Sequence, residues 1–293
     1  MMRYAKGDKI FHAVNTLYLV TFFIVIFFPL LYVVSASFSS PLLLTQGKIF
    51  ILPRGLTIEG YARVFRNRDI WLGLRNSVFY TIAGTIFNLF MTTLAAYPLS
   101  RPNLKYRGFF SAIFVFTMMF NAGLIPNYLL MQKLHLVNNP LVLIIPGAIT
   151  ITNMIIMRTF FSTTIPEELH EAAIIDGAGN LRTLVSVVLP LSKSVYAVMA
   201  LYYGVAHWNS YFNAMIYLAN RSLFPLQVFL REILTQNQVN NMSQDSGITL
   251  DHLLIGETLK YCIIVFASLP ILIIYPFLQK NLIKGVMIGA VKG

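Results

Sequence analysis

Long apolar stretches without a charged residue alternate with polar segments along this 293-residue chain. A helix needs about 20 apolar residues to cross a hydrocarbon core roughly 30 Å thick, and a charge at its centre is costly. Six long stretches lack Asp, Glu, Lys and Arg: 10–47, 76–100, 108–132, 134–157, 194–220 and 261–279. The pattern therefore predicts an all-α membrane protein whose single transmembrane domain, 1–293, has six spans near 14–36, 77–99, 109–131, 140–161, 194–217 and 259–280.

Prolines recur within or beside these predicted spans, at Pro29, Pro98, Pro126, Pro146, Pro270 and Pro276. Each proline removes a backbone hydrogen-bond donor, so we expect kinked helices. Kinked helices are more typical of a transport pathway that changes shape than of a rigid membrane anchor. The first apolar run, 17–34, is longer than the roughly 7–15-residue core of a cleavable signal peptide and predicts a retained span.

The composition agrees with a polytopic membrane protein. Only 11% of the residues are charged and 57% are hydrophobic, whereas soluble domains carry about 25% charged residues.

An even number of spans places both termini on one side of the membrane. With the termini inside, twelve Lys and Arg residues lie inside and ten outside, and the short loop 100–108 has three basic residues and no acid, which is the bias expected of cytoplasmic segments. We therefore expect both termini in the cytoplasm, and the net charge of +11 requires no nucleic acid.

Two outer segments are predicted to contain helices. Apolar residues at helical spacing between Ile58 and Phe65 predict an amphipathic helix that Thr57 caps, with a basic loop at the headgroups as the alternative. In the segment 218–258, a similar spacing from Leu226 to Ile233 predicts a short helix before a flexible stretch around 236–247.

A charged segment at 165–178 interrupts the apolar chain. Four of the eleven acidic residues lie there within ten positions: Glu167, Glu168, Glu171 and Asp176. Thr164 and Glu167 have the spacing of a capping box, and Pro166 suits a first helical turn. The sequence therefore predicts a helix with acids in its first turns, where they complement the helix dipole.

The other side of this helix is apolar, with Leu169, Ala172 and Ala173 leading to Asp176 at helical spacing. The alanines leave room for another backbone to approach, and Gly177 or Gly179 can take positive φ and end the helix. The alternative is an amphipathic hairpin resting on the cytoplasmic membrane surface. A surface anchor near anionic lipid should be basic, so the acids favour a protein partner.

The fifth span contains polar residues near its outer half, which must face protein or water. Trp208, Asn209, Tyr211 and Asn213 are candidates for lining a solute path. The alternatives are hydrogen bonds between helices, in which His207 could also take part, or a position at the outer membrane interface.

The segments Glu171-Ala172-Ala173, Asp176-Gly177-Ala178 and Leu189-Pro190 resemble the EAA loop of permease subunits of bacterial ATP-binding-cassette importers. Val187 stands where that pattern usually has Ile. The last nine residues, Gly285 to Gly293, are similar to the tail of the carbohydrate-importing, maltose-permease-like branch.

This resemblance implies a cytoplasmic EAA loop, 162–190, whose coupling helix at about 166–178 sits in a cleft of a separate ATPase subunit. The implied coupling residues are Glu167, Glu168, Glu171, Ala172, Ala173, Asp176, Gly177, Leu189 and Pro190, and Glu171 is expected to make the main polar contact. The implied partners are a second permease subunit, two ATPase subunits that bind ATP and Mg²⁺, an extracytoplasmic solute-binding protein and the lipid of the bacterial inner membrane. The implied solute is a sugar or oligosaccharide, and the branch includes importers of acidic ones such as alginate fragments.

Other classes fit the sequence less well. No phosphate-binding G-x-x-x-x-G-K-[ST] loop occurs, so we expect no ATP hydrolysis by this chain. The five histidines and the single Cys262 are scattered, so neither a metal site nor a catalytic site is predicted. A secondary active transporter is the main alternative, but its spans would normally carry charged residues that couple ions. A structural scaffold would leave the acidic helix unexplained.

Overall fold

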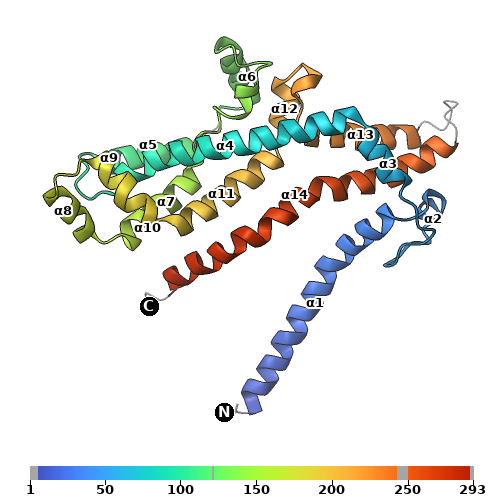
Figure 1. Ribbon diagram of the computed structural model, residues 1–293, viewed down its shortest axis with the longest axis horizontal. Helices are drawn as coiled ribbons and strands as arrows, with labels where there is room; N and C mark the ends of the chain where they lie inside the picture. The colour runs from blue at the N-terminus through green and yellow to red at the C-terminus, as the bar shows by residue number, and fades with distance from the viewer. Residues whose placement is uncertain (1–5, 121, 243–249, 291–293) are drawn as a thin grey trace. The chain divides into compact units, whose positions relative to one another are not determined.

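The computed structural model describes residues 6–120, 122–242 and 250–290. It is 78% helical, and the described residues form no β-strand, which confirms an all-α membrane protein. The chain divides into two compact units, residues 1–70 with 230–269 and residues 71–229 with 270–293. Each unit is described by itself, and Figure 1 identifies their helices.

Among the described residues, three helical segments are long and apolar enough to cross a membrane by themselves: Ile10–Ser37 of α1 (Lys6–Ser37), α4 (Arg68–Ser100), and Gly256–Pro276 of α14 (Leu250–Ala290). Two bent pairs raise the number to five if each pair is one span. The pairs are α5 (Arg107–Met119) with α6 (Leu124–Lys133), bent by 114°, and Asn180–Leu191 with α11 (Lys193–Trp208), bent by 83°.

The predicted span at 140–161 is not one continuous helix. A 3₁₀ turn, Pro140–Leu143, is followed by non-helical backbone and then by α7 (Ile151–Thr164). The 14 residues of α7 extend about 21 Å, which is shorter than a hydrocarbon core. The number of six spans therefore stays a prediction.

The first unit contains α1, together with α2 (Pro41–Thr45) and α3 (Glu59–Arg66). Residues 10–30 of α1 expose apolar side chains all around the helix, as expected for a helix surrounded by lipid or other membrane helices. α3 confirms the predicted amphipathic helix. Its N-cap residue is Ile58 rather than the predicted Thr57, although the Thr57 hydroxyl accepts a hydrogen bond from the backbone N–H of Glu59. Cys262 is buried against Gly60, so its thiol has a packing role.

The core of the second unit is built around α4. Residues near its end, including Tyr97, pack with Met157 and Phe161 of α7 and with Met199 and Tyr203 of α11. A second cluster joins Tyr80 to the 3₁₀ turn at 140–143 and to α12 (Phe212–Tyr217). A short 3₁₀ turn, Arg221–Leu223, leads into α13 (Leu226–Met242).

α13 confirms the helix expected from Leu226, but it continues to Met242, so the predicted flexible stretch does not begin at 236. The rest of that stretch, 243–247, lies outside the described residues. At the other end of the chain, α14 continues through the tail as far as Ala290, and the last three residues also lie outside the described part.

Candidate coupling site

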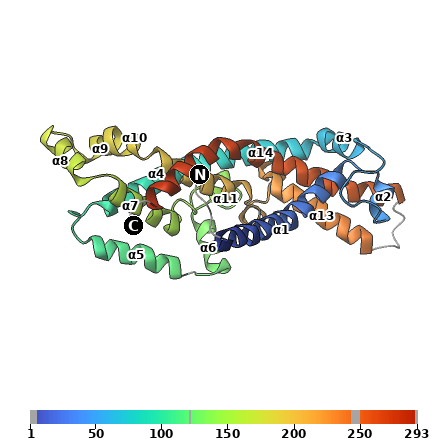
Figure 2. The ribbon, with the colours of Figure 1, turned by 90° about the horizontal axis from the view of Figure 1, so that it is seen from below.

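The acidic segment forms α8 (Glu167–Ile175), which follows α7 after a two-residue break. Figures 1 and 2 show α8, with α9 (Asn180–Thr183) and α10 (Leu189–Leu191), near the end of α4 that carries Ser100. Pro166 is the N-cap residue, with extended backbone, and no side chain caps the helix. The predicted capping box is therefore wrong, because Thr164 still belongs to α7 and the Glu167 carboxylate is bound elsewhere.

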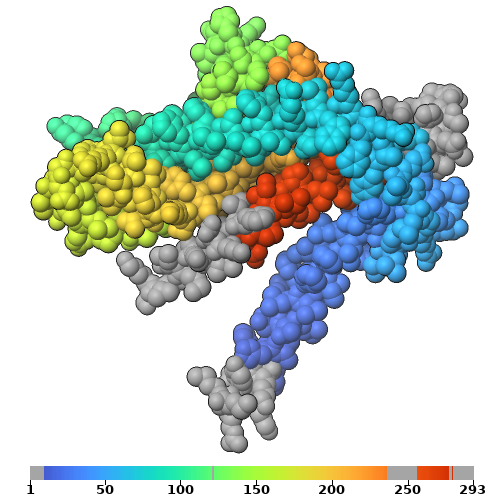
Figure 3. Space-filling view, in the orientation of Figure 1, coloured from blue at the N-terminus to red at the C-terminus, as the bar shows by residue number. Residues whose placement is uncertain are grey.

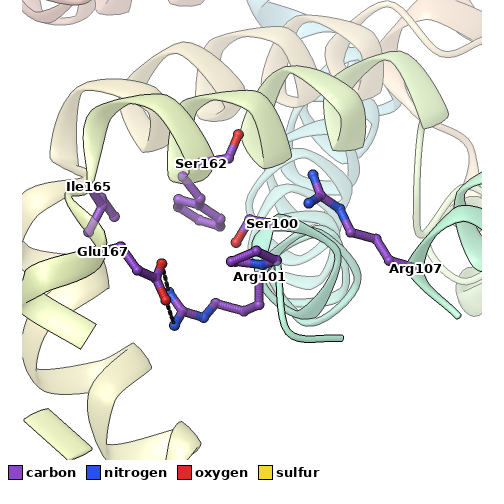
Figure 4. A pocket seen from close by; sticks show the side chains of 8 residues that line it. Ser100, Arg101, Arg107, Ser162, Ile165 and Glu167 are labelled. Atoms are coloured by element: carbon purple, nitrogen blue, oxygen red, sulfur yellow. Dashed lines mark hydrogen bonds and ion pairs between the residues drawn. The ribbon is translucent and has the colours of Figure 1, made fainter. Parts of the chain in front are cut away.

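The Glu167 carboxylate forms an ion pair with Arg101, which directly follows the end of α4. The two guanidinium nitrogens of Arg101 donate hydrogen bonds of 2.9 and 2.6 Å to the two carboxylate oxygens (Figure 4). The Arg101 side chain is 18% exposed and that of Glu167 is 41% exposed. The pair lines a cavity of about 280 Å³, which Arg107 enters from the start of α5. Local sequence patterns contain no sign of this partner, because 66 residues separate the two side chains.

The inner face of α8 is formed by His170 and Ala173. His170 is 4% exposed, and its ring centroid lies 6.2 Å from that of Tyr97 in the last turns of α4. Burial lowers the pKa of His170, the nearby Arg101 charge lowers it further, and Glu167 partly offsets these effects. Ala173 was expected on the docking side, but it is buried and packs α8 onto the rest of the chain, which corrects that expectation.

The outer face of α8 combines acidic and apolar side chains. The exposed residues are Glu168, Glu171, Ala172 and Asp176 from the predicted set, together with Leu169, Ile174 and Ile175. Ile175 is 85% exposed, which is unusual for so large an apolar side chain beside a cluster of acids. Figure 3 shows this region of the chain uncovered on the viewed face. Sequence reasoning missed the two isoleucines because it assigned the apolar side of the helix to Leu169, Ala172 and Ala173.

Gly177 ends α8, as the sequence predicts. Its φ is +75°, the Ala178 N–H donates to the Ala173 carbonyl at 2.8 Å, and the Gly177 N–H donates to the Ile174 carbonyl at 2.9 Å. These bonds form a Schellman motif, which requires the left-handed conformation that glycine adopts without strain. A Cβ at Gly177 would meet no atom within 4 Å, so the surface beside it is open. Gly179 has a φ of −73° and only precedes α9.

The predicted coupling residues Leu189 and Pro190 lie in α10, after a π-helical turn at Leu184–Val188. Pro190 cannot donate a backbone hydrogen bond, which accounts for irregular helix geometry in the turn before it. Leu189 is half-buried and Pro190 is exposed. The chain then bends by 83° into α11, so this segment connects α8 to a membrane helix.

The four candidate path residues occupy different surroundings. Trp208 is 5% exposed, so it packs in the core rather than facing an open path, which corrects that expectation. Asn209 ends α11 and donates its side-chain amide to the Val205 carbonyl at 2.9 Å. Tyr211 and Asn213 are exposed beside the break between α11 and α12, where a path remains a hypothesis.

A cluster of neutral polar groups, the mid-span cluster, lies between α4, α11 and the non-helical backbone before α7. Asn88 donates its side-chain amide to the carbonyls of Gly147 and Ala148, and its Oδ1 accepts a hydrogen bond from the Nε2 of His207 at 2.6 Å. The hydroxyls of Thr92 and Tyr203 lie 2.7 Å apart. Of the interpretations open for His207, a hydrogen bond between helices is therefore confirmed. Within the described ranges, no three His, Cys, Asp or Glu side chains group as metal ligands.

No family model matches the chain, but curated proteins align over nearly all of it. Protein LplC of Bacillus subtilis is 36% identical over 293 residues, covering 100% of this chain and 98% of that protein. The polygalacturonan/rhamnogalacturonan transport system permease protein YtcP of Bacillus subtilis is 36% identical over 281 residues, 94% of this chain and 96% of that protein. The chain belongs to the family of permease subunits of carbohydrate ATP-binding-cassette importers. Its function is that of a non-catalytic membrane subunit in sugar import.

A solved structure supports the same assignment. This permease resembles a chain of a bacterial ATP-binding-cassette transporter involved in the import of the acidic polysaccharide alginate, with a TM-score of 0.84 and 35% sequence identity. The match covers 96% of this permease and 99% of that chain. The permease fold therefore extends over nearly the whole length.

Proposed function

We propose that this permease receives the force for transport through the outer face of α8, which docks onto an ATPase subunit. The observation that carries the proposal is the exposed combination of Glu168, Glu171 and Asp176 with Ile175 on one short helix. Acidic side chains around an apolar residue match a cleft that has an apolar floor and basic walls. Glu171 makes the main polar contact, and Ala172 and Gly177 let the partner approach closely.

The alternatives explain these residues less well. A helix that rested on anionic lipid would place its three exposed acids against a negative surface, which is unfavourable. A secondary transporter driven by ions needs a charged residue inside a span, and the charge-free intervals contain none. An ATPase partner accounts for the acidic surface and for the absence of a phosphate-binding loop in this chain.

The complete importer, in this proposal, contains this permease, a second permease, two ATPase subunits and an extracytoplasmic solute-binding protein. ATP and Mg²⁺ bind to the ATPase subunits. The two permeases form the pathway through the inner membrane, with six spans in this subunit and both termini in the cytoplasm. Cysteine-labelling from each side of the membrane tests the topology, since residues at both termini and in α8 should react only from the cytoplasmic side.

The docking surface is tested by charge reversal and by removal of its apolar contact. Glu171→Lys and Ile175→Asp should each weaken co-purification of the ATPase with the permease by about tenfold or more, as expected for a central interface residue. Leu52→Asp is the matched control, because Leu52 is a comparably exposed apolar residue in the loop before α3. Normal ATPase association in both α8 variants would overturn the proposal.

The solute in this proposal is an oligosaccharide rich in uronic acids. Polygalacturonan and alginate, named for the two similar proteins, are both polymers of uronic acids. The outer segment 37–75 carries six Lys and Arg residues and two acids, a charge that favours anionic solutes. Proteoliposomes with the whole importer and its binding protein should accumulate oligogalacturonate or oligomannuronate in preference to neutral arabino- or malto-oligosaccharides. Uptake of only the neutral sugars would refute this assignment.

A further inference from the structure

Two contacts between α8 and the end of α4 come from residues at matching positions on the two helices. Tyr97 and Arg101 are four residues apart at the end of α4, and Glu167 and His170 are three residues apart on α8. Residues at these spacings lie on one helix face. Arg101 binds Glu167 through two hydrogen bonds, while the Tyr97 ring packs against His170. A helix held at one point can pivot, whereas two points one turn apart also fix its direction.

The attachment is stiff at both points. Arg101 continues the last turn of α4, because its N–H donates to the Pro98 carbonyl at 3.1 Å. The paired hydrogen bonds from a planar guanidinium to both carboxylate oxygens restrict the angle between the groups as well as their distance. Tyr97 and His170 are both buried, so their rings are held by surrounding side chains.

The covalent chain provides no equivalent link to α4. Through Ile165 and Pro166, α8 is connected to α7, and through the segment 176–191 it is connected to α11. α4 is distant from α8 in sequence, so only non-covalent contacts can make it follow a displacement of α8. α4 is also a continuous helix of 33 residues, and its length is about 50 Å. It carries Asn88 and Thr92 of the mid-span cluster.

We propose that the joint formed by Tyr97, Arg101, Glu167 and His170 transmits the movement of α8 to α4. Arg101 is then a positioning residue, which acts through Glu167 and does not itself touch the ATPase. The proposal rests on the proposed function, because it assumes that α8 is the part that the ATPase moves. It assigns Glu167 to the connection within this chain, while Glu171 and Ile175 face the partner.

The test uses the assembled importer in proteoliposomes and measures ATPase association, ATP hydrolysis and solute uptake. Arg101→Glu and Glu167→Arg should each keep ATPase association but lower the solute moved per ATP hydrolysed by about tenfold, within the usual range of coupling between sites. The double variant Arg101→Glu with Glu167→Arg should restore most of the solute moved per ATP hydrolysed, because an ion pair can form again with the two charges exchanged. Arg101→Lys should give an intermediate ratio, since it keeps the charge and loses the paired hydrogen bonds.

Arg107→Glu is the matched control. Arg107 lies in the same loop region and lines the same cavity, and no ion pair joins it to the residues that the structure describes. The same charge reversal at half-buried Arg107 should leave the ratio within about twofold of the unmodified importer, since the substitution removes no ion pair. If Arg107→Glu lowered the solute moved per ATP hydrolysed by the same factor, the proposed joint would be wrong. The effect would then depend on the total charge of this region and not on the Arg101–Glu167 pair.

The two proposals fail in different ways. If Glu171→Lys and Ile175→Asp leave ATPase association unchanged, the docking role of α8 is wrong. If those variants lose association while Arg101→Glu and Glu167→Arg keep a normal transport ratio, the docking role stands and the joint is wrong. The joint is also overturned if the single variants lose coupling and the double variant restores none of it.

Discussion

Two of the levels at which α4 makes polar contacts, its middle and its end, differ in chemistry. In the middle of the helix, Asn88 and Thr92 use neutral groups, with fully buried side chains, to bind His207, Tyr203 and the backbone before α7. At its end, Arg101 uses a charge to bind Glu167, and both side chains keep some contact with solvent. Both levels connect segments that are far apart in the sequence.

The difference follows from the surroundings. A charge in the middle of the bilayer costs about 2.5–3.5 kcal/mol even on the lenient insertion scale, so the middle of α4 is connected by amide, imidazole and hydroxyl groups. At the end of α4, nearby water lowers the cost of charge, so an ion pair can form there. We infer that the middle contacts mainly hold the fold together, whereas the end contacts mainly keep α8 aligned with α4.

The largest effect is expected from removing the side-chain amide of Asn88, which tests whether the contacts in the middle of α4 stabilise the fold. Asn88→Leu leaves two backbone carbonyls and His207 without their partner, which should lower the free energy of unfolding by about 2–4 kcal/mol. Chemical unfolding of the purified permease in detergent measures the change. A loss below about 0.5 kcal/mol, the usual range for surface substitutions, would mean that the middle contacts do not hold the fold.

A smaller effect is expected when the ion pair itself is measured. A double-mutant cycle with Arg101→Met and Glu167→Gln should give a coupling energy of about 0.5–1 kcal/mol, because the Glu167 carboxylate is partly exposed. One molar NaCl should reduce this value, since the Debye length falls to about 3 Å at that concentration and interactions between exposed charges over longer distances are largely screened. The corresponding cycle between Asn88 and His207 should not respond to salt. Equal salt responses at the two levels would remove the distinction between them.

A third pair of substitutions should raise the free energy of unfolding instead of lowering it. Thr81 and Thr85 lie on α4, and their hydroxyl oxygens are buried without a hydrogen-bond partner among the described residues. The Thr85 hydroxyl lies near Gly204 of α11, since a Cβ at Gly204 would be 3.7 Å from it. Thr85→Val and Thr81→Val replace an unsatisfied hydroxyl by a methyl of the same shape, so each should stabilise the permease by up to about 1 kcal/mol. Destabilisation in the same unfolding assay would indicate that these hydroxyls bind water or solute in the working protein.

The sequence predicted the features that depend on local patterns. Charge-free intervals predicted the apolar helices, the acidic run predicted α8, and Gly177 was recognised as one of two residues able to end it. These features arise from residues close together in the chain, where periodicity and turn chemistry are informative.

The features that depend on distant residues were not predictable in the same way. The 140–161 interval is largely apolar, but its middle leaves helical geometry where Asn88 binds the carbonyls of Gly147 and Ala148. The spacing of Thr164 and Glu167 suggested a capping box, yet Arg101 competes for the same carboxylate. The two partners, Asn88 and Arg101, lie on α4 or directly after it. No local pattern in the segments that they contact indicates them.

No local sequence pattern indicates the role of His170, and its substitution has the smallest expected effect. Its pKa in the folded protein is lowered from the usual 6.5, mainly by burial, with the Arg101 charge acting in the same direction and Glu167 against it. Between the lowered pKa and the usual value, the unfolded chain binds more protons than the folded one, so stability rises with pH in that window. The stability from neutral His170 is therefore complete above about pH 6.5 and declines as the pH falls below it. Thermal unfolding should show a larger loss from about pH 7.5 to about pH 5.5 in the unmodified permease than in His170→Gln, which cannot take up a proton. The ion pair at the end of α4 is present in both proteins, so an identical pH response would show that His170 contributes nothing to the attachment of α8.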